Sequence, residues 1–222
     1  MIRAAGDSAL VINLGNEIDE EINKRVHAIA RRIEEERIVG IKEVVPTYTS
    51  IYVYYDPLIV SYDKLKFLLK NYLIEEPRAM NGKIVEIPVI YGGKYGPDIE
   101  FVASYNGLSV DDVIELHTKP LYRVYMLGFL PGFAYLGGMD ERIATPRLEN
   151  PRKRVPAGSV GIAGKQTGWY AIESPGGWRI IGRTPLRTFD PSKEPPSIVL
   201  PGDYVKFKAI DEYNAEEYDG ND

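Results

Sequence analysis

The sequence predicts two domains of different class, an α+β domain followed by a mainly β domain. The length of 222 residues suits one large or two small domains, each able to bury a core. Strand-like and helix-like stretches alternate through roughly the first 80 residues. Residues 128–190 then hold 17 of the 37 Gly and Pro residues in the chain, which indicates short strands joined by turns.

The first domain opens with a strand and a long helix. Residues 9–14, ALVINL, form a short apolar run that predicts a strand. Asn16 lies where a helix N-cap is expected, because acidic residues follow it in the first turn. Apolar residues then recur at steps of three or four up to a stop at Gly40, which predicts a helix with one buried face. These residues are Ile18, Ile22, Val26, Ile29 and Ile33.

Three further strands and a second helix complete the first domain. Strand-like runs cover residues 41–45, 50–55 and 83–90. Before the last of them, Ser61 predicts the cap of a second helix. Its apolar stripe comprises Leu65, Leu68, Leu69, Tyr72 and Leu73. The resulting order, βαββαβ, predicts a ferredoxin-like two-layer sandwich over residues 1–82.

The second domain, residues 83–210, is expected to be a β-barrel or a β-sandwich. A turn, YGGKYGPD, leads into two short helical stretches, of which the second is capped by Ser109 and ends at His117. Strand-like runs follow at residues 121–127, 159–164, 169–174, 178–183 and 204–210. Residues 211–222 form an acidic tail beyond this domain.

Composition and charge exclude several classes of protein. The tail holds six acidic residues and no basic one, so the rest of the chain has 27 basic and 26 acidic residues. The rest of the chain shows no stripe of basic residues, which argues against nucleic acid binding. With no cysteine and only two histidines, the sequence predicts no disulfide, no thiolate nucleophile and no metal site. No apolar run approaches the ~18 residues of a membrane span, and a cytoplasmic location is expected.

The densest candidate for a functional site is the glycine-rich segment from Gly128 to Arg183. Glycine in long loops lets backbone amides approach a ligand closely. The polar groups in or next to this segment are Arg154, Ser159, Lys165, Gln166, Thr167, Glu173, Ser174, Arg179, Arg183 and Thr184. Aromatic walls are expected from Phe129, Phe133, Tyr135, Trp169 and Trp178. Such a mix suits a carboxylate or carboxamide ligand, although the same glycines equally fit simple turns between strands.

Other kinds of chemistry are restricted. No P-loop motif of the form GxxxxGK[ST] occurs, and Ser159 in AGSVG lacks the context of a nucleophile elbow. The basic run at residues 152–154 has two interpretations, an anion-binding site or a solvated turn. His27 lies on the first helix and is expected to be structural. His117 precedes the strand that leads to the glycine-rich loops and is a candidate general acid or base.

The order of motifs in the second domain resembles one known family. The blocks are GFLPGFAYLGGMD, ATPR, RVPAGSVGIAGKQTG, ESPGGWRIIGRTPL and FDP, with GPDIEFVA and the helix ending at His117 upstream. They are similar to those of the family that contains the kinase inhibitor KipI, allophanate hydrolase subunit 1 and the B-type subunit of 5-oxoprolinase (PxpB). The resemblance extends to about Ile210. It implies a small N-terminal α+β domain and a cyclophilin-like β-barrel, without the arginine-centred signature of prolyl isomerases.

The resemblance also implies an activity and partners. The chain would be a non-autonomous subunit of an ATP-dependent 5-oxoprolinase, which converts 5-oxo-L-proline to L-glutamate. Its partners would be a KipA/PxpC-type subunit and a LamB/PxpA-type subunit, with ATP used at the level of the complex. Inhibition of a sensor histidine kinase is the alternative, as is a role in an allophanate hydrolase or urea carboxylase-like system. No motif separates these functions.

Carried onto this sequence, the resemblance implies a set of site residues. His117 is expected to transfer a proton, and Gln166 to orient the amide. Arg154 and Arg183 are expected to neutralise the substrate carboxylate or a phosphorylated intermediate. The residues expected to bind substrate are Phe129, Gly132, Tyr135, Thr167, Ser174 and Thr184.

Overall fold

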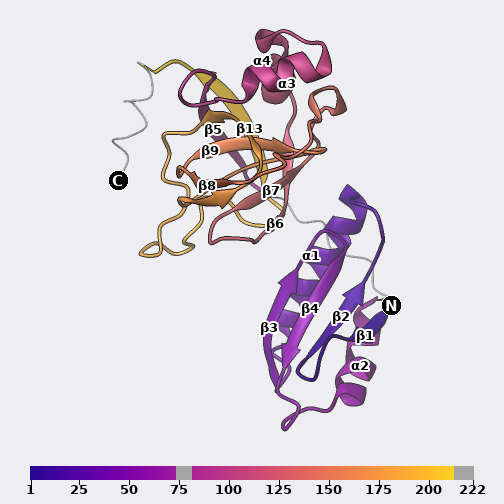
Figure 1. The fold of residues 1–222 in the computed structure, drawn as a ribbon. Helices are drawn as coiled ribbons and strands as arrows, with labels where there is room; N and C mark the ends of the chain where they lie inside the picture. The colour runs from indigo at the N-terminus through magenta and orange to yellow at the C-terminus, as the bar shows by residue number, and fades with distance from the viewer. Residues whose placement is uncertain (74–81, 213–222) are drawn as a thin grey trace. The chain divides into compact units, whose positions relative to one another are not determined.

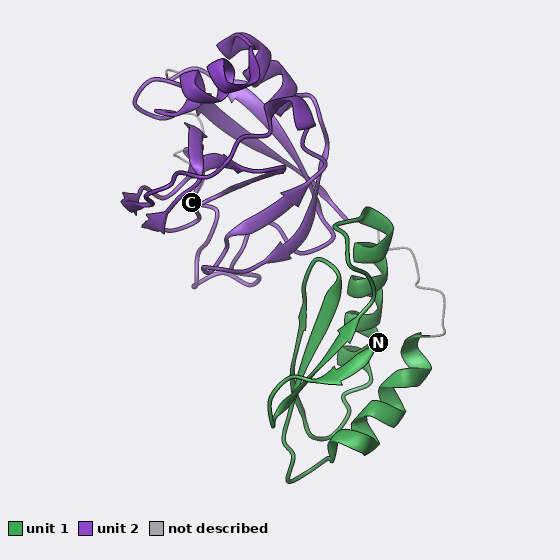
Figure 2. Cartoon of the chain, turned by 45° about the vertical axis from the view of Figure 1, so that its right-hand side comes forward, with its two compact units in different colours: residues 1–81 green, residues 82–222 purple. Residues whose placement is uncertain are grey.

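Figure 1 shows the fold in a computed structural model that describes residues 1–73 and 82–212. The chain divides into two compact units, residues 1–81 and 82–222 (Figure 2). All but the first two residues of the expected acidic tail, residues 211–222, lie outside the described part of the chain. No helix within the described residues is long and apolar enough to cross a membrane.

The N-terminal unit is a four-stranded antiparallel sheet whose buried face packs against helices. The elements are β1 (Ile2–Ala4), β2 (Ala9–Asn13), α1 (Glu20–Glu35), β3 (Ile41–Pro46), β4 (Ser50–Tyr55), α2 (Tyr62–Lys70) and a 3-10 turn, η1 (Asn71–Leu73). The strand order is β1-β2-β4-β3. Alternation along β4 buries Ile51 and Val53 and leaves Tyr52 and Tyr54 exposed. The buried side joins the apolar faces of both helices in one core.

The expected βαββαβ order is wrong in its last strand. The run at residues 83–90 forms β5 (Ile84–Tyr91), which belongs to the second unit and pairs in parallel with its last strand, β13 (Tyr204–Ile210). The edge position beside β2 is taken instead by β1, which was not expected. The reason is burial, because Ile87 and Val89 fill the core of the second unit. The ferredoxin-like topology is therefore not confirmed.

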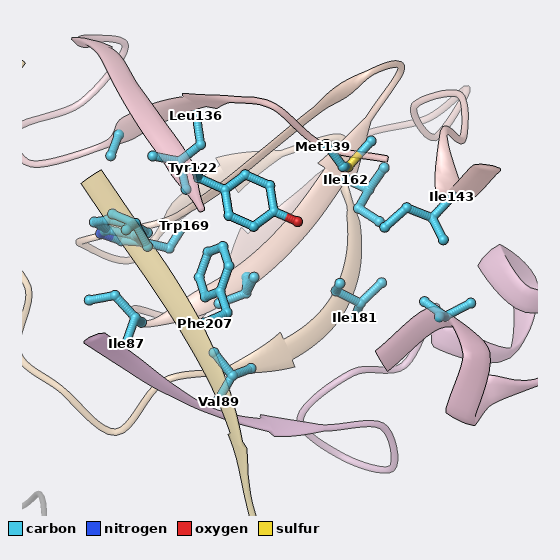
Figure 3. Packing of buried hydrophobic residues seen from close by; sticks show 14 of the residues in the cluster. Ile87, Val89, Tyr122, Leu136, Met139, Ile143, Ile162, Trp169, Ile181 and Phe207 are labelled. Atoms are coloured by element: carbon cyan, nitrogen blue, oxygen red, sulfur yellow. The ribbon is translucent and has the colours of Figure 1, made fainter. Parts of the chain in front are cut away.

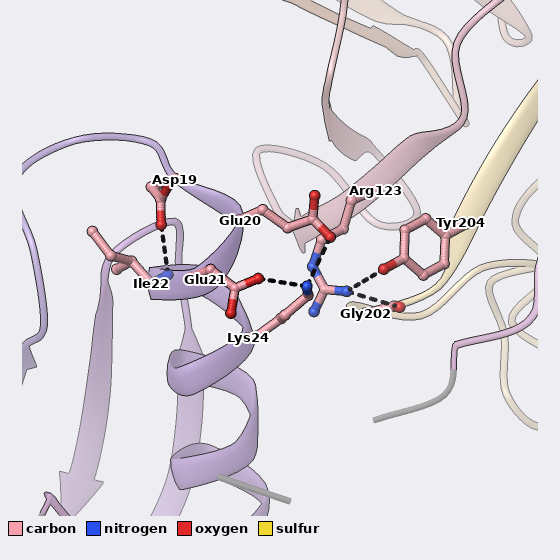
Figure 4. Close-up of polar contacts among 8 residues, drawn as sticks. All are labelled: Asp19, Glu20, Glu21, Ile22, Lys24, Arg123, Gly202 and Tyr204. Atoms are coloured by element: carbon pink, nitrogen blue, oxygen red, sulfur yellow. Dashed lines mark hydrogen bonds and ion pairs between the residues drawn. The ribbon is translucent and has the colours of Figure 1, made fainter. Parts of the chain in front are cut away.

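Helix α1 begins later than Asn16. Its N-cap is Asp19, whose carboxylate accepts a hydrogen bond of 2.9 Å from the backbone N–H of Ile22 (Figure 4). Ile18 consequently lies before the helix and is exposed. The expected N-cap at Asn16 was wrong because four acidic residues in close succession offered more than one capping carboxylate, and the structure uses Asp19.

The second unit is built around a closed seven-stranded barrel with the order β10-β7-β6-β13-β5-β12-β9. The remaining barrel strands are β6 (Tyr122–Leu127), β7 (Ala134–Gly137), β9 (Ser159–Ala163), β10 (Gln166–Trp169) and β12 (Arg179–Arg183). A separate two-stranded sheet consists of β8 (Arg152–Val155) and β11 (Ser174–Gly176). The helical elements are α3 (Ile99–Asn106), α4 (Val110–Thr118) and a 3-10 turn, η2 (Glu141–Ile143). The expectation of a mainly β barrel is confirmed.

The two other predicted N-caps are also confirmed. The hydroxyl of Ser61 accepts a hydrogen bond of 3.4 Å from the backbone N–H of Lys64 at the start of α2. Ser109 and Asp112 form a reciprocal capping box at the start of α4. In both helices the cap satisfies a backbone N–H that would otherwise have no partner within the helix.

Large apolar side chains fill the barrel interior (Figure 3). Tyr122, Trp169 and Phe207 are buried there from three different strands, and the ring centroids of Tyr122 and Phe207 lie 5.3 Å apart. Val102 and Val113 extend this core to α3 and α4. Because side chains alternate along a strand, the neighbours of these core residues face outward. A ligand on the outer surface of the barrel can therefore contact these outward-facing residues.

One expected strand, at residues 169–174, is wrong. β10 begins earlier, at Gln166, and ends at Trp169, while β11 begins only at Ser174. The strand prediction failed because the apolar residues of this run are buried in two different cores. Trp169 is buried in the barrel interior, whereas Tyr170 packs in a separate cluster outside it. Consecutive apolar residues therefore do not mark a continuous strand here.

Candidate functional site

A glycine platform lies on the outer side of the barrel, since the chain neighbours of its glycines fill the core. Gly161 of β9 and Gly168 of β10 are directly opposite each other, and Tyr135 of β7 is opposite Gly168. A Cβ atom at Gly168 would lie 2.3 Å from the carbonyl oxygen of Ala134, so no side chain fits there. The side chain of Trp178 occupies the space above these two glycines. An ideal Cβ atom built at Gly161 would lie 3.2 Å from Cβ of Trp178, and one built at Gly168 would lie 3.5 Å from its Cζ3.

Aromatic side chains cover this platform. They form the aromatic cluster, which consists of Phe129, Phe133, Tyr135, Tyr170 and Trp178. Phe133 is its centre, because its ring centroid lies 4.9 Å from that of Tyr135 and 5.2 Å from that of Tyr170. The ring of Trp178 is 5.3 Å away, edge to face. Val155 of β8 closes this small apolar core, which is separate from the barrel interior.

Phe129 is held in an exposed and strained conformation. Its φ of 67° lies in the left-handed region that bulky residues disfavour, and 62% of the residue is exposed. Its ring contacts that of Phe133 edge to face at 5.5 Å. Gly132 in the same loop has a φ of 73° and packs against Phe189. Backbone strain at an exposed aromatic residue makes the Phe129 loop a candidate ligand or partner site.

Arg154 and Ser174 come from the two-stranded sheet beside the aromatic cluster. The side chain of Arg154 is 77% exposed, and its Nε lies 2.7 Å from a carboxylate oxygen of Glu173. Ser174 lies opposite Val155, and its buried hydroxyl has no hydrogen-bond partner among the described residues. Because a buried hydroxyl without a partner is unfavourable, this group is a candidate ligand contact.

Arg183, Thr184 and Gln166 lie at strand ends. Nε of Arg183 donates a hydrogen bond of 2.8 Å to the carbonyl oxygen of Ala157. The hydroxyl of buried Thr184 accepts one of 3.2 Å from the backbone N–H of Leu186. Gln166 is the first residue of β10 and is half-buried. Arg183 and Thr184 therefore brace the loops beside Ser159 at the start of β9, whereas Gln166 lies opposite Ala163 at the other end of that strand.

His117 and Thr167 lie inside the barrel and contact each other. Nε2 of His117 is 2.8 Å from the hydroxyl of Thr167, and that hydroxyl donates to the carbonyl oxygen of Gly161 at 3.0 Å. Nδ1 of His117 is 2.7 Å from the hydroxyl of Tyr91. Since the Thr167 proton is already used, Nε2–H donates to Thr167 and the Tyr91 hydroxyl donates to Nδ1. The network runs from β5 through α4 to the platform strands.

Burial keeps His117 neutral. The residue is fully buried, and desolvation lowers its pKa to about 3. The ring of Phe207 lies 4.5 Å from the imidazole. With both nitrogens bonded and no exposed atom, His117 can orient Thr167 and the strands beside it. This geometry favours a positioning role over the expected proton transfer.

The turn between β5 and α3 has two features of a phosphate site. It contains glycines and leads from a strand into a helix N-terminus, a common place for phosphate. Asp98, however, places a carboxylate at that N-terminus. The carboxylate accepts hydrogen bonds of 2.8 Å from Arg152 and 2.7 Å from the backbone N–H of Ile180. The Arg152 guanidinium and the Ile180 N–H are therefore already bound by Asp98, so neither is available to an ATP phosphate at this turn.

Within residues 1–73 and 82–212, no group of three or more His, Asp or Glu side chains could hold a metal ion.

The expected site omitted two residues that the structure places on the outer face, Arg147 and Tyr170. The guanidinium carbon of Arg147 lies 5.9 Å from the centroid of the Trp178 ring. Tyr170 is buried in the aromatic cluster. The signal for Arg147 was its place at the end of the ATPR block. The signal for Tyr170 was its alternation with core-facing Trp169.

Residues 1–199 match a family model described as carboxyltransferase domain, subdomain C and D. The chain belongs to this family. It is 48% identical to the B-type subunit of 5-oxoprolinase from Bacillus subtilis, over 98% of this chain and 95% of that protein. The motif resemblance to the family of this 5-oxoprolinase component is thereby confirmed.

Solved structures share the fold of this carboxyltransferase family member. PH0987 from Pyrococcus horikoshii is 69% identical, covers 97% of this chain and 100% of its own, and gives a TM-score of 0.60. The urea carboxylase of Kluyveromyces lactis is 23% identical over 97% of this chain and 22% of its own, with a TM-score of 0.80. The second likeness concerns the fold alone.

Proposed function

We propose that this chain is the B-type (PxpB) component of an ATP-dependent 5-oxoprolinase. The complex would hydrolyse the lactam of 5-oxo-L-proline to L-glutamate, while ATP and water give ADP and phosphate. The observation that carries the proposal is the aromatic cluster with its neighbouring arginines, which suits a small ring bearing a carboxylate. The 48% identity to the corresponding 5-oxoprolinase component of Bacillus subtilis supports it.

The chain is proposed to act only with a KipA/PxpC-type subunit and a LamB/PxpA-type subunit. Its family covers subdomains C and D of a carboxyltransferase domain, so the function of the whole domain would need other subdomains. Exposed Phe129 supports a surface completed by a partner, because exposed aromatic residues are typical of interfaces. ATP would be bound at the level of this complex.

The residues of the outer face have chemistry that matches a lactam substrate. The side chain of Gln166 carries one donor group and one acceptor, as an amide does. Arg154 and Arg183 would neutralise a phosphorylated intermediate, and Arg154 would exchange its contact with Glu173 for that ligand. The buried hydroxyl of Ser174 would supply a further hydrogen bond.

Glutamate formation by the reconstituted three-subunit complex tests this function. We expect Arg154→Ala to lower kcat/KM about tenfold or more, because a hydrogen bond to a charged group contributes ~1.5–3 kcal/mol. Gln166→Ala should lower it about fivefold, because a neutral hydrogen bond contributes ~1 kcal/mol. Arg31→Ala is the matched control, since Arg31 lies exposed on α1 and pairs only with Glu35 in the described structure.

The outcomes separate the residue roles from the function. Wild-type rates for both Arg154→Ala and Gln166→Ala would refute the assigned roles. A wild-type complex that forms no glutamate with ATP would refute the function itself. Inhibition of a histidine kinase and a role in an allophanate hydrolase or urea carboxylase-like system stay predictions.

A further inference from the structure

Arg147 differs from the other arginines near the aromatic cluster. Arg152 pairs with Asp98, Arg154 pairs with Glu173, and Arg183 donates to a backbone carbonyl oxygen. Arg147 makes no ion pair or hydrogen bond within the part of the chain that the structure describes. It is exposed and lies over the Trp178 ring, with 5.9 Å between its guanidinium carbon and the ring centroid. Its donors are therefore available to an anion.

The Arg147 charge acts on the pKa of two phenol groups, Tyr135 and Tyr170. Burial raises the pKa of Tyr135, and the Arg147 charge opposes this shift. Burial also raises the pKa of Tyr170, against a hydrogen bond from the Trp178 backbone and the charges of Arg147 and Arg152. Both phenols therefore keep their protons near neutral pH.

We propose that Arg147 is the carboxylate-binding group of a subsite on the outer face, with the Tyr135 ring and the Trp178 ring forming its wall. The ligand class is a small ring that bears one carboxylate. The proposal rests on the proposed function in one respect, namely that 5-oxo-L-proline is such a ligand. Arg147 would hold the substrate carboxylate, while Arg154 and Arg183 act on the intermediate.

The geometry favours a carboxylate over a phosphate. A guanidinium presents a planar pair of N–H groups that matches the two oxygens of one carboxylate. Arg147 offers one positive charge, and the neighbouring Arg152 charge is already balanced by Asp98 at 2.8 Å. The rings of Trp178 and Tyr135 meet edge to face with centroids 6.1 Å apart, and this apolar corner suits a small ring better than a tetrahedral anion.

Tryptophan fluorescence of the full chain can test the subsite directly. The chain has two tryptophans, of which Trp169 is buried in the barrel core and Trp178 lies under Arg147. We expect 5-oxo-L-proline to change the emission saturably and 2-pyrrolidinone, the same lactam without a carboxylate, to leave it unchanged. Arg147→Gln should weaken the apparent affinity at least tenfold. Arg187→Gln, at an exposed arginine paired with Asp190, is the matched control.

Three results would overturn the subsite. One is an unchanged 5-oxo-L-proline affinity in Arg147→Gln. Another is an equal, Arg147-dependent response to inorganic phosphate, which would make this a phosphate site. The third is the absence of a saturable response both in the chain alone and in the reconstituted complex.

The same reagents separate the subsite from the proposed function. If the complex turns over 5-oxo-L-proline and Arg147→Gln does not raise KM, the subsite fails and the function stands. If the wild-type complex forms no glutamate but the chain binds 5-oxo-L-proline through Arg147, the function fails and the subsite stands.

Discussion

Replacing Phe133 with Ala is expected to lower the free energy of unfolding of the second unit by about 3–5 kcal/mol. Phe133 is 1% exposed and is the centre of the aromatic cluster. Its removal leaves a cavity between Tyr135, Tyr170 and Trp178 that the rigid glycine platform beneath cannot fill. The loop that carries Phe129 would lose its support at the same time.

Urea unfolding followed by tryptophan fluorescence measures this effect, because both tryptophans belong to the second unit. Tyr105→Ala is the matched control in the same unit. Tyr105 is 57% exposed on α3, so its loss should change the stability by less than about 1 kcal/mol. Equal effects of the two substitutions would contradict the central place of Phe133 in the cluster.

The second large effect is a loss of folding stability in acid that follows from the burial of His117. An imidazole in the unfolded chain binds a proton near pH 6.5, whereas burial lowers the pKa of His117 in the folded chain to about 3. Between these values the unfolded chain binds more protons. The contribution of neutral His117 is therefore fully present above pH 6.5. It is lost as the pH falls toward 3, at up to about 1.4 kcal/mol per pH unit.

Among the described residues, no carboxylate faces the imidazole to offset its protonation. The groups packed against it are Tyr91 of β5, Tyr122 of β6, Thr167 of β10 and Phe207 of β13. A proton on Nδ1 would also remove the acceptor of the Tyr91 hydroxyl. Both effects act in the same direction and destabilise the folded barrel in acid.

Urea unfolding at pH values from 7.5 down to 4.5 tests the role of His117. We expect His117→Gln to lower the stability at pH 7.5 by about 1–3 kcal/mol, because buried hydrogen-bond partners are left unsatisfied. Its stability should then decline less steeply with acid than that of the wild type. His27→Gln is the control, since it removes the other histidine and keeps His117. Parallel pH profiles for wild type and His117→Gln would contradict this assignment.

Strands with a clear apolar pattern were predictable from the sequence, and their sheet membership was not. The runs at residues 50–55 and 204–210 form β4 and β13 with the expected bounds. The run at 83–90 also forms a strand, but its partner is β13 in the barrel rather than the N-terminal sheet. Apolar alternation indicates that a strand has a buried face, but it does not indicate in which core that face is buried.

The segment that holds the candidate site was identifiable from the sequence, whereas the contacts of its individual residues were not. Glycine density located the outer face, because Gly161 and Gly168 are needed under Trp178. The sequence could not show that Arg154 already pairs with Glu173 or that Arg147 makes no such contact among the described residues, since both are arginines in short loops or strands. Ion pairing depends on side-chain placement in three dimensions.

The glycine platform sets the shape of the candidate site because its two glycines have no side-chain atoms. The floor under Trp178 is backbone, so its depth does not change when side chains on β9 or β10 change rotamer. Variation in ligand size across related chains would then be expected in the walls, above all in the Phe129 loop and in β8. An engineer who wishes to alter selectivity should vary those walls and leave the two glycines untouched.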